Sequence, residues 1–228
     1  MTELELRESV IDACQRMNLL GINQGNSGNI SVRCGKQMLI SPSAVPYDRL
    51  EPHMIASMPI EGPYGVWQGS HKPSTEWRFH LDIMRARSEV SAIVHSHPTF
   101  ATVLAIAHRD IEACHYMIAA FGGDNIRCAP YAVFGSEELS ALTVDALRDR
   151  MGCLLANHGM VVLGETLDKA MWRAVELESI ARQYYYALLL GSPHILSAAD
   201  IEAALSKFSS YGIIEDTDQE HGVEKAGG

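Results

Sequence analysis

A short apolar segment that ends in two histidines constrains this chain more than any other feature. Residues 92–98 read Ala-Ile-Val-His-Ser-His-Pro, which predicts a buried strand that stops at the proline. Alternate residues of a strand point to the same face, so His95 and His97 would present both imidazoles to one spot. Such a pair suits zinc or another borderline divalent metal. The alternative is two structural histidines with satisfied hydrogen bonds, and the spacing alone leaves both interpretations open.

A second apolar segment leads to a third histidine. Strands are expected over residues 153–157 and 160–163, on either side of a tight turn that contains His158 and Gly159. Glycine at this position lets backbone approach closely. Three histidines with one open position are typical of a catalytic zinc site rather than a closed structural one. His158 therefore favours the metal interpretation of the histidine pair.

Length and composition narrow the class of protein. The chain has 228 residues, 47% of them hydrophobic, so one domain with a sizeable core is expected. A formal net charge of −10 disfavours nucleic acid and anionic membranes as partners. The first residues are acidic and no run of about 18 apolar residues occurs, so neither a secretory signal nor a membrane span is expected. Five widely spaced cysteines indicate reduced thiols and a cytoplasmic protein.

Hydrophobic periodicity and turn residues predict interleaved helices and strands. Helices are expected over residues 2–20, 74–87, 99–107, 136–151, 167–190 and 198–208, and further strands over residues 29–33, 37–40, 54–58 and 126–133. Thr2 with Glu5 predicts a capping box, and Ser74 or Thr75 is expected to cap the second helix. The interleaving indicates an α/β or α+β fold in one domain, residues 1–214, followed by a mobile polar tail, residues 215–228.

Glu76 is predicted in the first turn of the second helix, where the helix dipole stabilises a carboxylate. One interpretation is that Glu76 does no more than stabilise the N-terminus of this helix. It could also act as a general acid/base near the metal, whose charge would help to set its pKa. The sequence around Glu76 leaves these two roles equally open.

Three short polar loops could bind phosphate without a lysine, through free amides and hydroxyls. Most loops of this composition are only turns, so each is a weak signal by itself. The loops are Gly28-Asn29, Ser43-Ala44 and Ser74-Thr75.

Two classes of enzyme are disfavoured. No lysine lies in an apolar strand, where a Schiff-base lysine is normally desolvated. No Gly-x-Gly-x-x-Gly or Walker pattern occurs, so neither a dinucleotide site nor an ATP site is indicated.

Several longer segments together resemble the class II aldolase/adducin family, and within it the zinc-dependent L-fuculose-phosphate aldolases. The resemblance runs from about Arg7 to Gly212 and includes segments that are long and unusual. They are Gly21–Gly25, Gly28–Arg33, Ser74–His80, Val94–His97, His115–Ala120, Cys128–Gly135, Asn157–Gly159 and Tyr211-Gly212.

The resemblance implies a three-layer α/β domain with a central, mostly antiparallel sheet flanked by helices. It implies one zinc ion per subunit, bound by His95, His97 and His158. Glu76 would be the acid/base residue and a further zinc ligand when no substrate is bound. The family is typically a C4 homotetramer with active sites between subunits. The implied remaining residues are the phosphate ligands Gly28, Asn29, Ser43, Ala44, Ser74 and Thr75, a catalytic Tyr116 that reaches a neighbouring site, and Tyr211, which would help to close the site.

The implied activity is reversible cleavage of a ketose 1-phosphate of the L-fuculose 1-phosphate type. The products would be dihydroxyacetone phosphate and a short aldehyde, formed through a zinc-stabilised enediolate. Alternatives are aldolases for 5-deoxyribulose 1-phosphate or 5-(methylthio)ribulose 1-phosphate, and family epimerases, dehydratases or decarboxylases. A non-enzymatic binding role like that of adducin is disfavoured by the intact histidines and Glu76.

Some positions depart from the family pattern. Ala44 stands where the family usually has glycine, so its methyl group would crowd an amide contact to phosphate or demand a different φ. Asn26-Ser27 and residues 98–100 also differ. These departures bear on the exact substrate more than on the chemistry.

Overall fold

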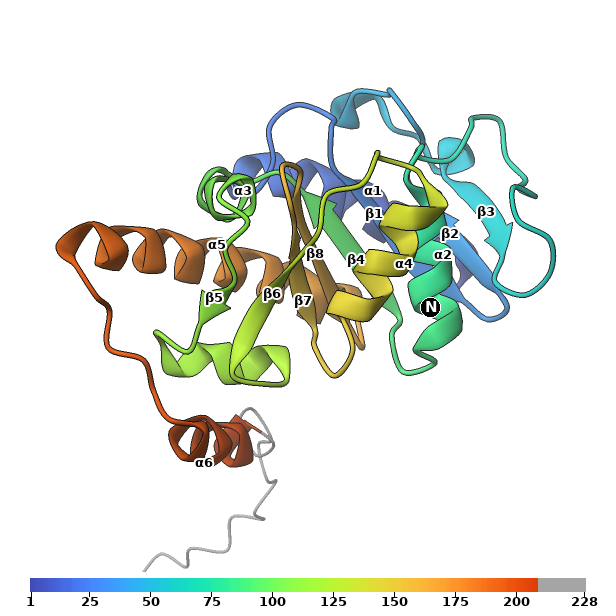
Figure 1. Cartoon of the computed structure of the whole chain (residues 1–228). Coiled ribbons are helices and arrows are strands. Elements are labelled where there is room, and N and C mark those ends of the chain that lie inside the picture. Colours follow the sequence, from blue (N-terminus) through green and yellow to red (C-terminus); the bar gives the residue numbers. More distant parts are fainter. Residues whose placement is uncertain (209–228) are drawn as a thin grey trace, which may run out of the picture.

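The computed structural model describes residues 1–208, so Tyr211 and the predicted tail lie outside the described residues (Figure 1). The helices are α1 (Glu3–Leu19), α2 (Trp77–Ala86), α3 (Thr99–Ile106), α4 (Glu137–Ala146), α5 (Leu167–Leu190) and α6 (Ala198–Phe208). The strands are β1 (Asn29–Cys34), β2 (Gln37–Ile40), β3 (Ala56–Pro59), β4 (Ala92–Ser96), β5 (Ile111–Glu112), β6 (Asn125–Ala129), β7 (Gly152–Leu155) and β8 (Gly159–Gly164). Short 3-10 helices are Tyr47–Arg49, Pro52–Met54 and η3 (Tyr116–Phe121).

The eight strands within residues 1–208 form one sheet, in the order β3-β2-β1-β4-β8-β7-β6-β5. Only β6 and β7 pair in parallel, and the other neighbours are antiparallel. The predicted mostly antiparallel central sheet is therefore confirmed. The histidine strand β4 lies inside the sheet, between β1 and β8.

Helices cover both faces of the sheet, which confirms the predicted three-layer arrangement. One core joins α1, α3 and α5 to one face, and Val94 points into it. The other core joins α2 and α4 to the opposite face, and Ile93 points into it. Figure 1 shows α2 and α4 side by side over that face. By the alternation of the strand, His95 follows Ile93 toward α2, where its ring meets Phe79 edge-on at a centroid distance of 5.4 Å.

Three boundaries differ from the sequence prediction by three residues or more. The second helix begins at Trp77, so Glu76 precedes the helix rather than lying in its first turn, and its side chain makes no capping bond. The strand predicted to reach residue 133 ends at Ala129, because Pro130 cannot donate to a ladder. Helix α4 ends at Ala146 instead of about residue 151, and Asp149 then adopts a left-handed φ of 57°. None of the helices within residues 1–208 is long and apolar enough to cross a membrane.

Helix α3 starts directly after the second histidine, and a residue of α5 holds that start in place. Pro98, at the N-cap, offers no side-chain hydrogen bond. Instead, the half-buried Glu178 carboxylate accepts the Phe100 and Ala101 backbone N–H groups at 2.9 and 2.8 Å. A carboxylate at a helix N-terminus satisfies two free donors and is favoured by the dipole. This contact anchors the chain just beyond His97.

We predict that Glu178→Ala lowers the free energy of unfolding by about 2 kcal/mol, because it leaves two shielded N–H groups without acceptors. Urea unfolding followed by circular dichroism measures the change. Glu176→Ala, on the same helix, is the matched control, since the acceptor of the Phe100 and Ala101 N–H groups is Glu178. Equal stability of the two variants would contradict the capping role.

Candidate metal centre and substrate site

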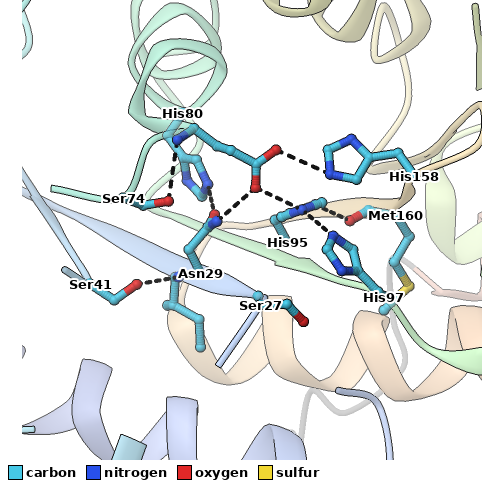
Figure 2. A network of polar contacts seen from close by, with 12 residues as sticks. Ser27, Asn29, Ser41, Ser74, His80, His95, His97, His158 and Met160 are labelled. Carbon is cyan, nitrogen blue, oxygen red and sulfur yellow. Dashed lines mark hydrogen bonds and ion pairs between the residues drawn. The ribbon is translucent and has the colours of Figure 1, made fainter. Parts of the chain in front are cut away.

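Three histidine rings meet at one end of the central strands (Figure 2). His95 is the fourth residue of β4, His97 follows that strand, and His158 occupies the turn between β7 and β8. The ring centroids are 4.7 Å apart for His95 and His97, 4.8 Å for His95 and His158, and 4.9 Å for His97 and His158. Because β4 and β8 are neighbours in the sheet, His158 joins two histidines that precede it by more than 60 positions in the sequence.

Glu76 completes this cluster from the start of α2. Its Oε2 lies 3.0 Å from His95 Nε2, and its Oε1 lies 3.1 Å from His158 Nε2. The carboxylate is 5% exposed. Burial of a charged group is costly unless it is paired, so the two rings explain why this side chain turns inward instead of capping the helix.

One hydrogen bond fixes the ring of His95 with a nitrogen free for a metal. Its Nδ1 lies 2.9 Å from the Met160 carbonyl oxygen, so Nδ1 carries the proton and donates it. Its Nε2 faces the cluster, 2.9 Å from His97 Nε2, and in the neutral ring this nitrogen carries the lone pair that a metal needs. A backbone carbonyl that orients a metal-binding histidine through its other nitrogen is a common arrangement.

The donor set fits a divalent ion of the zinc type. The ligand atoms of Glu76, His95, His97 and His158 all lie within 4.8 Å of one another. Tetrahedral zinc bound to nitrogen places neighbouring ligand atoms about 3.3 Å apart, close to the 2.9–3.1 Å separations here. Imidazole and carboxylate are ligands that zinc prefers, and three histidines leave a position for substrate.

The electrostatics of the cluster favour the metal-binding protonation states of Glu76 and His97. Burial would raise the pKa of Glu76, but the charge of His95 and hydrogen bonds from both rings lower it well below its usual range. Burial, followed by repulsion from His95 and His158, lowers the pKa of His97 to about 3. For His95 burial acts downward, yet the Glu76 charge raises its pKa. The carboxylate is thus ionised and His97 neutral at pH 7, as metal ligands must be.

The turn that carries His158 is built from residues with little freedom. Asn157 adopts a left-handed φ of 55°, and its Oδ1 lies 2.6 Å from His108 Nε2. A Cβ on Gly159 would lie 2.5 Å from both His97 Cδ2 and the Ser96 carbonyl oxygen. The absence of a side chain at Gly159 is therefore what allows His97 to stand beside His158.

The predicted phosphate loops lie next to one another around this cluster. Ser41, at the end of the β2 hairpin, accepts the Ile30 N–H through Oγ at 3.1 Å, and its carbonyl accepts the Ser74 N–H at 3.0 Å. The Ser43 N–H donates to the Lys72 carbonyl at 3.1 Å. Asn29 donates from Nδ2 to Glu76 Oε2 at 3.0 Å. The loops are thereby tied to each other and to the carboxylate.

A cavity of about 350 Å³ opens beside the cluster. Polar residues line one part of it and the apolar segment after β6 lines another. Of the described residues predicted for the site, Thr75, Glu76, His97 and His158 line this cavity. Its other lining residues are Ser27, Tyr131, Ala132, Phe134 and Asn157. The predicted residues Gly28, Asn29, Ser43, Ala44, Ser74 and His95 are not among them.

Ala44 keeps the backbone conformation that a glycine would adopt. Its φ is 60°, so the expectation that alanine would demand a different φ is wrong. A left-handed conformation costs a residue with a Cβ roughly 1–2 kcal/mol. The loop therefore retains its shape at the expense of local strain.

Tyr116 does not line this cavity within one chain. Tyr116 lies on η3, is 55% exposed and stacks on Phe208 of α6 at a centroid distance of 6.3 Å. Tyr116 and Phe208 line a separate groove with Trp172. Tyr211 lies outside the described residues.

The sequence reasoning missed His80 and the aromatic residues of the cavity. His80 lies four residues after Glu76, so it is on the same side of α2, and this spacing was the available signal. Tyr131 and Phe134 are 58% and 64% exposed. Two aromatic residues just after a strand gave a weak signal of their own.

A family model described as the class II aldolase and adducin N-terminal domain matches residues 8–185. This chain belongs to the class II aldolase and adducin family. The predicted family, and the class of enzyme with it, are thus confirmed.

Individual members of the class II aldolase and adducin family are similar to the chain over most of their length. A 5-methylthioribulose-1-phosphate/5-deoxyribulose-1-phosphate aldolase of Rhodospirillum rubrum is 46% identical over 211 residues, which cover 92% of this chain and 94% of that protein. The L-fuculose phosphate aldolase of Escherichia coli K12 is 42% identical, over 93% and 98% of the two chains. A solved structure of L-fuculose 1-phosphate aldolase matches with a TM-score of 0.86 and 33% identity, over 90% of this chain and 96% of that chain.

We predict that Gly159→Ala displaces His97 and weakens metal binding at least tenfold, because the new methyl group overlaps its ring. Competition with a zinc-sensitive chelator measures the affinity, and circular dichroism checks the fold. The exposed variant His53→Ala is expected to bind zinc like the unmodified protein. Unchanged affinity of Gly159→Ala would contradict this account of the turn.

We also predict that Ala44→Gly raises the free energy of unfolding by about 1 kcal/mol, since glycine adopts a φ of 60° without strain. Thermal and urea unfolding measure the change. Ala141→Gly, at an exposed position of α4, is the control and should destabilise by about 1 kcal/mol. Destabilisation by both variants would show that Ala44 carries no strain.

Proposed function

We propose that this chain cleaves a ketose 1-phosphate between C3 and C4, releasing dihydroxyacetone phosphate and a short aldehyde. The observation that carries the proposal is Glu76, a buried carboxylate held 3.0 and 3.1 Å from two of three converged histidines. It also lines a cavity with Thr75 and Ser27. A buried carboxylate beside a metal site and polar loops is placed for proton transfer at a carbon next to a carbonyl group.

The metal of this proposal is one zinc ion per chain, held by His95, His97 and His158 with Glu76 as a further oxygen donor. When bound there, it supplies Lewis-acid stabilisation of the negative charge that develops on substrate oxygens. The geometric fit of the four donor groups supports this choice.

The side chains of the protein would perform the proton transfers. A tyrosine, Tyr116, takes the proton of the C4 hydroxyl and releases its own hydroxyl proton to solvent as the C3–C4 bond breaks and the C4 carbonyl forms. Glu76 takes up a proton from solvent and delivers it to C3 of the departing triose phosphate. The reaction balances without a further reactant, because one proton leaves oxygen and one arrives at carbon.

A neighbouring subunit would provide Tyr116. The ring is more than half exposed and lines a groove apart from the Glu76 cavity of its own chain. Both facts support a homotetramer with active sites between subunits, in which Tyr211 of the adjacent chain helps to close the site.

The phosphate of the substrate would bind the three polar loops. Their mutual hydrogen bonds, through Ser41, Ser74 and the Ser43 backbone, hold the amides and hydroxyls of these loops close to Asn29. Such groups bind phosphate by charge-assisted hydrogen bonds. The implied ligands are Gly28, Asn29, Ser43, Ala44, Ser74 and Thr75.

The aldehyde end of the substrate would contact Tyr131, Ala132 and Phe134, which also line the cavity. An apolar wall favours an aldehyde that ends in a methyl group. L-Lactaldehyde, acetaldehyde and methylthioacetaldehyde share this feature, and they derive from L-fuculose 1-phosphate, 5-deoxyribulose 1-phosphate and 5-(methylthio)ribulose 1-phosphate. The names of the relatives support all three sugars as candidates.

An assay of dihydroxyacetone phosphate release with these three sugars tests the proposal. Release from at least one of them, abolished by a chelator and restored by zinc, is expected. An isomeric sugar phosphate or a dehydrated sugar as product would instead indicate an epimerase or a dehydratase.

We predict that Glu76→Gln keeps the fold and one zinc ion per chain but lowers kcat about 10²–10⁴-fold, since an amide cannot exchange the proton at C3. Metal analysis and the release assay measure the two properties. Glu61→Gln, at an exposed position, should retain full activity. Turnover by Glu76→Gln near that of the unmodified protein would remove Glu76 from the mechanism.

A further inference from the structure

A series of hydrogen-bonded, buried side chains links Glu76 to Asn29, His80 and Ser31. Figure 2 labels Asn29 and His80 of this series. Ser31 Oγ lies 2.7 Å from His80 Nδ1, His80 Nε2 lies 2.5 Å from Asn29 Oδ1, and Asn29 Nδ2 lies 3.0 Å from Glu76 Oε2. Ser31 and His80 are fully buried, and Asn29 is 3% exposed. Water therefore does not compete for these hydrogen bonds.

The chemistry of these groups assigns one donor-to-acceptor direction to the whole series of hydrogen bonds. An ionised carboxylate only accepts, so Asn29 must turn its NH₂ group toward Glu76 and its oxygen toward His80. That oxygen only accepts, so His80 must carry its proton on Nε2. His80 Nδ1 is then an acceptor, and Ser31 donates its hydroxyl proton to it.

Without His80, nothing in this arrangement would hold the Asn29 amide in one orientation. The buried Oδ1 would lose its donor, and rotation of the amide would bring that oxygen against the Glu76 carboxylate. A buried acceptor without a partner is costly, as is the contact of two electron-rich oxygens. The histidine ring thus selects one of the two amide orientations.

We propose that His80 is a positioning residue for Glu76, acting through Asn29 with its own tautomer set by Ser31. The proposal rests on the proposed function, in which Glu76 moves a proton and Asn29 contacts the substrate phosphate. One N–H of the Asn29 amide is used by Glu76, which leaves the second for the phosphate. A single ring inside the protein therefore aligns the proton carrier with the phosphate site.

Three variants test this role. His80→Leu removes both hydrogen bonds and is expected to lower kcat/KM at least about tenfold, the effect of one lost hydrogen bond in the transition state. It should still bind one zinc ion per chain. His80→Gln keeps a donor for Asn29 Oδ1 and should recover kcat/KM to within about threefold of the unmodified protein. Normal kcat/KM of His80→Leu would overturn the proposal.

A double-mutant cycle separates positioning from a loss of packing. If His80 acts through Asn29, His80→Leu combined with Asn29→Ala should be no slower than Asn29→Ala alone. The buried neighbour Leu81 is the matched control, since Leu81→Ala should lower the melting temperature and leave kcat/KM unchanged at low temperature. An additive loss of kcat/KM from His80→Leu and Asn29→Ala would overturn the proposal.

Nitrogen-15 spectra of the zinc-loaded protein test the hydrogen-bond direction independently of any substrate. A neutral His80 ring with its proton on Nε2 is expected. A cationic ring, or a proton on Nδ1, would overturn the positioning role even if the protein is an aldolase. Conversely, an Nε2 proton together with no triose phosphate release from any of the three sugars would contradict the proposed function alone.

Discussion

The Glu76 carboxylate is buried between histidine rings, and the arrangement of the surrounding elements follows from keeping that charge satisfied. Oxygen atoms of Glu76 face His95, His158 and the Asn29 amide. A buried carboxylate with a partner removed is strongly destabilising, so β1, β4, the β7–β8 turn and the start of α2 must keep their relative positions. The same constraint prevents Glu76 from capping α2 in the ordinary way.

The sheet supplies the precision that such a cluster needs. In the register of β1 and β4, Asn29 lies directly opposite His95. The close approach of the Gly28 backbone to β4 requires glycine, because a Cβ at this position would lie 2.7 Å from the His95 carbonyl oxygen. On the other side of β4, Met160 of β8 orients the His95 ring. Rigid strands thus hold both the groups that face a metal and the groups that orient them.

Much of the fold and of the cluster could be predicted from local patterns. The alternation of β4 and its two histidines gave the metal interpretation, and the capping box of Thr2 with Glu5 at α1 is confirmed. The boundary at Glu76 could not be predicted, because its conformation is set by distant histidines rather than by helix signals. Strand β5 could not be predicted either, because its two residues are too few to form a periodic pattern.

Two further features could not be predicted from the sequence, for a different reason. They are the hydrogen bonds from His80 through Asn29 to Glu76 and the strain at Ala44. A histidine on an apolar helix face is most often structural, and only its hydrogen bonds to Ser31 and Asn29 connect it with Glu76. The left-handed φ of Ala44 follows from the loop around it, which overrides the preference of alanine.

The central claim is that one metal ion joins the three histidines in front of the Glu76 carboxylate. Anomalous diffraction at the zinc edge from crystals of the zinc-loaded protein tests this claim directly. The account predicts one strong peak per chain, within bonding distance of Nε2 of His95, His97 and His158. Absence of that peak, with the rings hydrogen-bonded to one another and to Glu76 instead, would contradict the central claim.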